Sequence, residues 1–98
     1  MANKLEEARK IINEVDSQMA ELFVKRMQAV KMVFEHKKEF GLPILDQKRE
    51  DEVIEKNLAL IEDAVLKEYY KVYLENLMSL SRAYQLRMHQ DFSQEEFI

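Results

Sequence analysis

The chain has 98 residues, enough for one small domain, and its 15 basic and 19 acidic residues leave a net charge of −4. It contains one Gly, one Pro and no Cys, and 47% of its residues are hydrophobic. This composition predicts a single all-α domain over residues 1–98 with very few connections, and it excludes disulfides and thiolate metal sites. The charges are interspersed and lack the basic balance or stripe expected of a protein that binds nucleic acid.

The N-terminal residues indicate where in the cell the protein is expected. The first seven, Met-Ala-Asn-Lys-Leu-Glu-Glu, are charged from the fourth onward and lack the apolar run of a signal peptide. No stretch of the sequence approaches the length of a membrane span. We therefore expect a cytoplasmic protein with no membrane partner.

The first predicted helix covers residues 3–40, because Gly41 and Pro43 favour helix termination. Positions three and four apart along it form one apolar seam that includes four ionisable side chains. Burying an unpaired charge costs free energy, so these side chains must pair with one another or bind a ligand of opposite charge. The seam consists of Leu5, Arg9, Ile12, Asp16, Met19, Phe23, Arg26, Val30, Val33 and Lys37.

This helix is long for so small a domain. The segment from Leu5 to Glu39 would span about 52 Å at 1.5 Å per residue, whereas a compact monomer of this size is only about 30 to 35 Å across. A second apolar flank runs along nearly the whole helix, so a second chain is needed to cover it. We expect a symmetric homodimer. The alternative is a lone helix in a coiled-coil tail.

The second predicted helix covers residues 47–61 and follows Asp46, a suitable N-cap. Its inward stripe begins with the polar residues Arg49 and Glu50 before it becomes apolar. The helical register then shifts between residues 62 and 65 without Gly or Pro, so this boundary is poorly defined by the sequence.

The third predicted helix covers residues 66–89. Ser81 and Gln85 lie on its apolar stripe, four positions apart, and are therefore within reach of one ligand. The polar and acidic tail, residues 91–98, is expected to be frayed.

Eight polar residues thus interrupt the apolar stripes. At least three of the four cations among them lack a carboxylate on their own face, and arginine suits bidentate binding of a carboxylate, so the set favours a ligand with two carboxylates. His36 and His89 lie beside the stripes and are interpreted as surface residues. No nucleophile–base pair, metal site or Gly-rich phosphate loop is predicted. The eight residues are Arg9, Arg26, Lys37, Asp46, Arg49, Glu50, Ser81 and Gln85.

The order of these residues resembles the all-helical class of chorismate mutase across residues 4–89. The similar pieces are Val15-Asp16, Leu22, Arg26, Lys37, Pro43-Ile-Leu-Asp46-Gln-Lys-Arg49-Glu50 and Ser81-Arg-Ala-Tyr-Gln85. The resemblance implies an intertwined homodimer of three-helix chains. Each of its two active sites would be completed by an arginine from the partner's first helix.

The same resemblance implies a reaction and its site. The reaction is the intramolecular Claisen rearrangement of chorismate to prephenate, a step toward Phe and Tyr, which needs no cofactor or metal. Arg26 and Arg9 of the partner subunit would hold the two carboxylates of the chorismate dianion. Lys37 and Gln85 would donate to the ether oxygen, and Lys37 would also reach a carboxylate.

The remaining matches have supporting roles. Arg49 is implied near the ring carboxylate, Glu50 as acceptor for the ring hydroxyl, and Asp46 and Ser81 as polar lining. We expect a monofunctional enzyme that stabilises negative charge developing on the ether oxygen and holds the substrate in its compact diaxial form.

Other interpretations stay open at this point. Taken singly, Lys37 could simply complement a helix dipole, and Glu50 could neutralise Arg49 or Arg26 in a structural pair. For the whole chain, the alternatives are an isochorismate pyruvate lyase, which forms pyruvate and salicylate in a similar pocket, and a non-catalytic helical dimer that binds a metabolite of the aromatic pathway.

Overall fold

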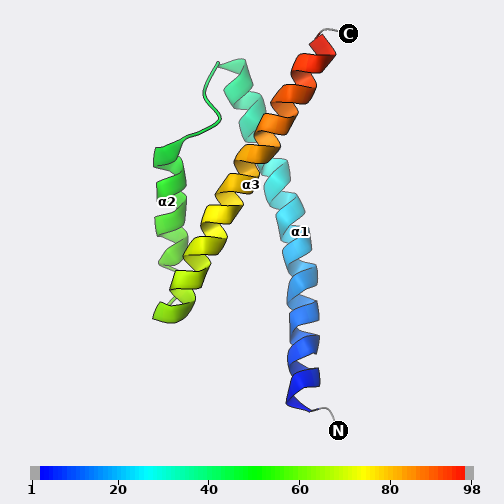
Figure 1. Ribbon diagram of the computed structural model, residues 1–98, viewed down its shortest axis with the longest axis vertical. Helices are drawn as coiled ribbons and strands as arrows, with labels where there is room; N and C mark the ends of the chain where they lie inside the picture. The colour runs from blue at the N-terminus through cyan, green and yellow to red at the C-terminus, as the bar shows by residue number, and fades with distance from the viewer. Residues whose placement is uncertain (1–2, 97–98) are drawn as a thin grey trace.

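The computed structural model describes residues 3–96, with the backbone alone for 92–96. Its three helices are α1 (Lys4–Glu39), α2 (Gln47–Leu58) and α3 (Ala64–Glu96), and the described residues contain no strand. The predicted all-α fold with three helices is therefore confirmed, but two of the helices rather than one are very long, α1 with 36 residues and α3 with 33. In Figure 1, α3 crosses α1 and runs beside α2, and it contacts both helices. None of the described helices has an apolar stretch long enough to cross a membrane.

Both ends of α1 are determined by local capping. At the N-terminus, the Asn3 side chain accepts a hydrogen bond from the Glu6 amide at 2.9 Å. At the C-terminus, Gly41 adopts a φ of +64°, and the Leu42 amide donates to the Lys37 carbonyl at 2.7 Å. This is the Schellman arrangement, which glycine favours because it has no Cβ to resist a positive φ. The observed helix lies within one residue of each predicted end.

The junction between α2 and α3 differs from the prediction. α2 ends at Leu58, three residues early, because the amides of Leu60 and Ile61 donate to carbonyls only three positions back. α3 begins at Ala64, two residues early, because the Asp63 carboxylate accepts from the amides two and three positions later, both at 2.9 Å. Asp63 thus acts as an N-cap that the sequence interpretation missed.

The end of α3 also differs. We expected the helix to stop at His89 and residues 91–98 to be frayed, but α3 continues to Glu96. The segment after His89 contains no Gly or Pro, so no residue there opposes a helix. Residues 97–98 lie outside the described residues.

A small core lies between α1 and α3, whereas α2 has no buried residue. The buried apolar residues are Val30 and Phe34 of α1 and Leu74 and Met78 of α3. The radius of gyration is 17.7 Å, compared with about 13 Å for a compact domain of this length. The chain is therefore far from compact by itself.

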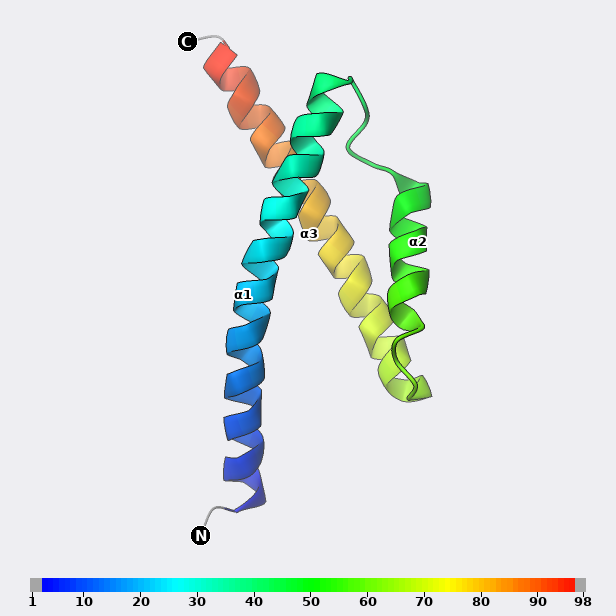
Figure 2. The same cartoon turned by 180° about the vertical axis from the view of Figure 1, so that it is seen from behind.

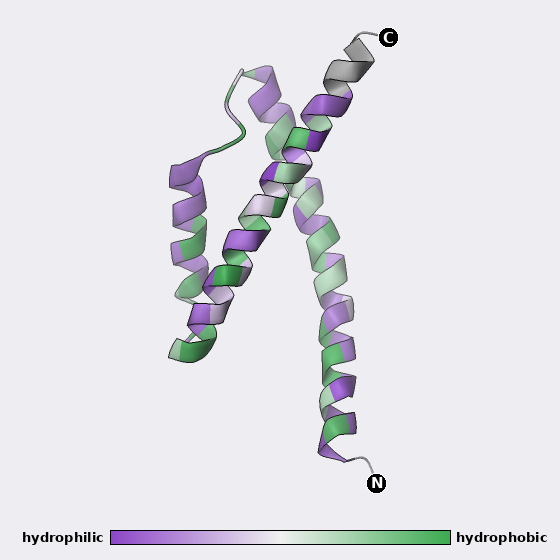
Figure 3. Ribbon diagram, in the orientation of Figure 1, coloured by the Kyte–Doolittle hydropathy of each residue, from purple (hydrophilic) through white to green (hydrophobic). Residues whose placement is uncertain are grey.

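The N-terminal half of α1 explains this shape. It projects away from α2 and α3 in both views (Figures 1 and 2), and hydrophobic residues recur along it (Figure 3). Large apolar side chains stay exposed there, so this half of the helix contributes little to the core of its own chain. These residues are Leu5, Ile11, Ile12, Val15 and Met19, and the exposed Leu22 and Phe23 follow just past the middle of the helix.

Candidate active site

A cavity of about 250 Å³ lies where the three helices approach one another. Seven of the eight predicted site residues line it, contributed by all three helices and by the loop between α1 and α2. The cavity therefore gathers polar side chains that lie as much as 59 positions apart in sequence (26 to 85). These seven residues are Arg26, Lys37, Asp46, Arg49, Glu50, Ser81 and Gln85.

Arg26 enters the cavity from α1 and is held by α3. Its Nη1 donates a hydrogen bond to the Ser81 hydroxyl at 2.6 Å, and that hydroxyl donates to the Leu77 carbonyl at 2.8 Å. Burial lowers the pKa of the Arg26 guanidinium, and the nearby Tyr73 partly opposes this shift. A partly desolvated cation with free donors gains from a carboxylate ligand, which would replace the lost hydration.

Lys37 lies in the last turn of α1. Its backbone carbonyl accepts the Schellman hydrogen bond, and its Nζ donates to the Ile44 carbonyl at 2.6 Å. The loop after α1 thus holds the ammonium group at the cavity. An ammonium has three donors, so Nζ can still bind a ligand.

Asp46 and Arg49 begin α2. The Asp46 carboxylate accepts from the Arg49 amide at 3.1 Å, which confirms the predicted N-cap. Both side chains are exposed at the edge of the cavity. The capping bond directs the first turn of α2, and with it Arg49, toward the site.

Glu50 forms an ion pair with Arg82 of α3 rather than with Arg49 or Arg26. The sequence interpretation considered Arg49 or Arg26 as the structural partner of Glu50, and both partners are wrong. Arg82 itself was missed, because it lies beside the predicted stripe of α3. A signal was available, since an acid on an inward stripe requires a cation on a facing helix.

Gln85 is the most deeply buried polar residue of the site, with 5% of its surface exposed. Its Oε1 atom is fully buried and has no hydrogen-bond partner among the described residues. A buried polar atom left unpaired costs free energy, and such atoms are rare in folded proteins. A ligand group that donates a hydrogen bond to Oε1 would explain its position, whereas a ligand acceptor such as an ether oxygen would bind the Nε2 end of the same amide.

Arg9 does not line the cavity. It is exposed in the N-terminal half of α1, 17 positions before Arg26 in the same helix. Within one chain, the structure therefore does not bring Arg9 to the other seven residues.

The charge of the cavity favours an anion. Four cations line it, Arg26, Lys37, Arg49 and Arg82, against two carboxylates, Asp46 and Glu50. Because Arg82 is paired with Glu50, the other three cations are not neutralised by that carboxylate. No group of three or more potential metal ligands occurs among the described residues.

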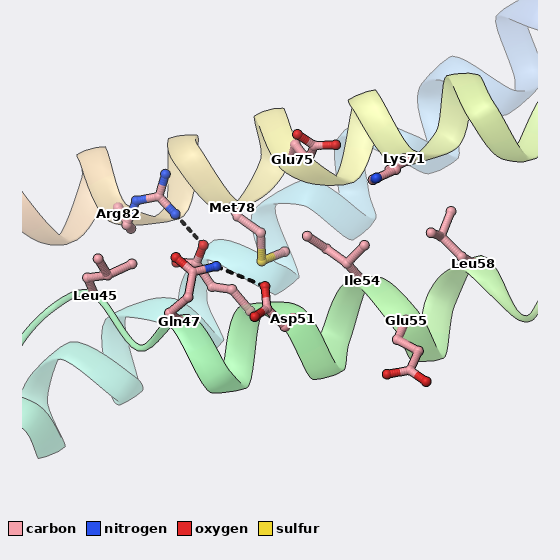
Figure 4. Close-up of a pocket in the computed structure, with 11 residues that line it drawn as sticks. Leu45, Gln47, Asp51, Ile54, Glu55, Leu58, Lys71, Glu75, Met78 and Arg82 are labelled. Carbon is pink, nitrogen blue, oxygen red and sulfur yellow. Dashed lines mark hydrogen bonds and ion pairs between the residues drawn. The ribbon is translucent and has the colours of Figure 1, made fainter.

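A larger groove of about 670 Å³ lies between α2 and α3 (Figure 4). It shares Glu50, Met78 and Arg82 with the cavity, so these three residues form the wall between the two spaces. Carboxylates outnumber cations in the groove, four to two. The groove is therefore less suited to an anion than the smaller cavity.

Comparison with known protein families identifies a match over most of the chain. The sequence model of the family described as chorismate mutase type II matches residues 8–86, most of the chain. Neither a curated protein nor a solved structure matches the chain.

Proposed function

Since the chain belongs to the chorismate mutase type II family, we propose that it converts chorismate to prephenate in the cavity between its three helices. One observation carries this assignment to a site: seven polar residues selected from the sequence line one cavity in which cations outnumber carboxylates. Chorismate is a dianion, so a positively charged cavity suits it.

Binding would rely on the arginines. Arg26 uses one donor for Ser81, which leaves most of its five donors for a substrate carboxylate. Arg49, exposed at the cavity edge, would contact the ring carboxylate. Glu50 would accept a hydrogen bond from the ring hydroxyl. Two carboxylates held at separate points would restrict the substrate to its compact reactive conformation.

Catalysis would rely on Lys37 and Gln85. The rearrangement breaks a carbon–oxygen bond and forms a carbon–carbon bond within one molecule, so it requires no nucleophile or proton transfer. Negative charge develops on the ether oxygen as that bond breaks. An ammonium and a buried amide donor, both at the cavity, would stabilise this charge without reorganisation.

A homodimer would complete the site. The exposed apolar residues of α1 need a covering surface, and among the side chains that the structure describes only four apolar ones are buried. A second copy, packed along α1 in an intertwined arrangement, would cover this surface. In that assembly Arg9 of the partner subunit would reach the second carboxylate of chorismate.

The test is the fate of chorismate. The purified protein is mixed with chorismate, the absorbance of the substrate is followed, and the product is identified. Prephenate supports the proposal, whereas salicylate with pyruvate would indicate the lyase, and no change would indicate a non-catalytic dimer. An Arg26→Ala protein purified in the same way controls for mutase from the expression host.

A further inference from the structure

We propose that Arg82 is a positioning residue that holds Glu50 for the ring hydroxyl of the substrate and keeps this carboxylate away from the substrate-binding cations. The inference rests on the proposed function and adds to it a residue with no role in the site predicted from the sequence. Arg82 acts from α3 on a side chain of α2, 32 positions away.

The ion pair of Glu50 and Arg82 lies in the wall between the cavity and the groove. Glu50, Met78 and Arg82 line both the cavity and the groove, and the dashed line from Arg82 in Figure 4 marks the ion pair. The Glu50 side chain is 15% exposed and that of Arg82 is 36% exposed. The carboxylate is thus the more buried partner, and a mostly buried carboxylate needs a cation nearby.

The ion pair uses one of the two carboxylate oxygens of Glu50. Arg82 uses Nη1 to contact only Oε1 of Glu50. Oε2 makes no hydrogen bond with the side chains that the structure describes. The guanidinium therefore restricts the carboxylate rotamer and leaves one oxygen as an acceptor for a hydroxyl group.

Arg82 also keeps Glu50 from competing with the substrate for the cations of the cavity. Without Arg82, the Glu50 carboxylate would be expected to pair with another cation that lines the cavity, Arg26 or Arg49. Such a pair would occupy donors that the substrate carboxylates need. Arg82 satisfies Glu50 from the wall, so the substrate-binding arginines remain available to the dianion.

This role predicts a particular kinetic pattern. A contact to the ring hydroxyl is made in the bound substrate and in the transition state alike, so weakening it raises KM and leaves kcat nearly unchanged. Arg82→Met should raise KM for chorismate about tenfold or more and change kcat less than about threefold. Arg82→Lys, which keeps the charge but not the planar fork, should recover part of the loss.

The decisive measurement is a double-mutant cycle with Glu50→Ala. Once Glu50 is absent, Arg82 has nothing to position, so adding Arg82→Met should change KM less than about twofold. Arg87→Met is the matched control, because it removes an exposed arginine of the same helix that pairs with Asp91 at 3.3 Å. It should leave both kinetic constants unchanged. Circular dichroism and thermal melts accompany each variant.

The possible outcomes separate a positioning role of Arg82 from a substrate contact and from a purely structural role. Additive effects of Arg82→Met and Glu50→Ala would show that Arg82 contacts the substrate itself and would overturn the positioning role. A fall in kcat at constant KM, together with a lower melting temperature, would mark Arg82 as a purely structural tie between α2 and α3, and also overturn it. If Arg82→Met does not fold, Arg82→Gln, which keeps a donor but no charge, makes the same comparison. If the native protein converts chorismate and the Arg82 variants have native kinetic constants, only the role of Arg82 is refuted. If the native protein leaves chorismate unchanged, the proposed function and the role of Arg82 are both refuted.

Discussion

Arg26 and Ser81, 55 positions apart in sequence, are joined by a hydrogen bond of 2.6 Å from Nη1 to Oγ. The Ser81 hydroxyl directs its own proton to the Leu77 carbonyl, so it serves as an acceptor for the guanidinium. α3 thereby orients a partly buried cation of α1. Ser81 is buried, with 7% of its surface exposed, so a water molecule does not easily take the place of its hydroxyl as the acceptor for Arg26.

This bond leads to a prediction for Ser81→Ala. Loss of the acceptor leaves one guanidinium donor of Arg26 unpaired and its orientation less restricted, so kcat/KM should fall about tenfold. Arg26→Ala, which removes the cation itself, should cost considerably more. Steady-state kinetics on both proteins make the comparison. If Ser81→Ala were as active as the native protein, the hydrogen bond would have no part in substrate binding.

Lys37→Ala should lower kcat by at least about 100-fold, the order expected when a donor to a developing oxyanion is lost. The fold should persist, because Gly41 and the Schellman hydrogen bond still end α1. Kinetics with circular dichroism check both statements. Lys31→Ala, at an exposed position of the same helix, is the control. A loss of helicity as large as the loss of activity would mark Lys37 as structural.

The exposed apolar half of α1 leads to a prediction about assembly. The protein should be a homodimer in light-scattering measurements, and Arg9→Ala and Arg26→Ala should each be nearly inactive. Unfolding and refolding the two variants together should restore part of the activity, because a mixed dimer keeps one site with both native arginines. A mixture no more active than the sum of its parents would refute the shared site.

The pH dependence should reflect Gln85. An amide donates without titrating, and no histidine lines the cavity, so native kcat/KM should be roughly flat from about pH 5.5 to 8. In Gln85→Glu the new carboxyl group donates only when protonated, and activity should fall close to tenfold per pH unit above its pKa. Rates of both proteins across this range are the test. A variant as active as native protein at pH 8 would remove Gln85 from the ether oxygen.

Arg26 adds no slope to that profile. Burial lowers its pKa in the folded protein, so the unfolded chain binds this proton more tightly, and folding stability would rise with pH only in the strongly alkaline range. Arginine keeps its charge at neutral pH. The free-energy cost of burying it is therefore constant over the range tested.

The sequence by itself determined the features that depend on neighbours within about one helical turn. Asn3, Gly41 and Asp46 mark helix ends through local hydrogen bonds or backbone freedom, and all three act there. Polar residues on apolar stripes were identifiable for the same reason, because helical periodicity predicts which side chains share a face. Seven of those residues line one cavity.

Tertiary structure decided the pairings between helices. The partner of Glu50 on α2 is Arg82 on α3, and the acceptor of the Arg26 guanidinium on α1 is Ser81 on α3; neither follows from periodicity. Such contacts depend on where and at what angle the helices cross, and at the crossing of α1 and α3 this is determined by the packing of Val30, Met78 and their buried neighbours. A side chain just off the predicted stripe, such as Arg82, can therefore line the site even though the periodicity of its own helix does not predict this.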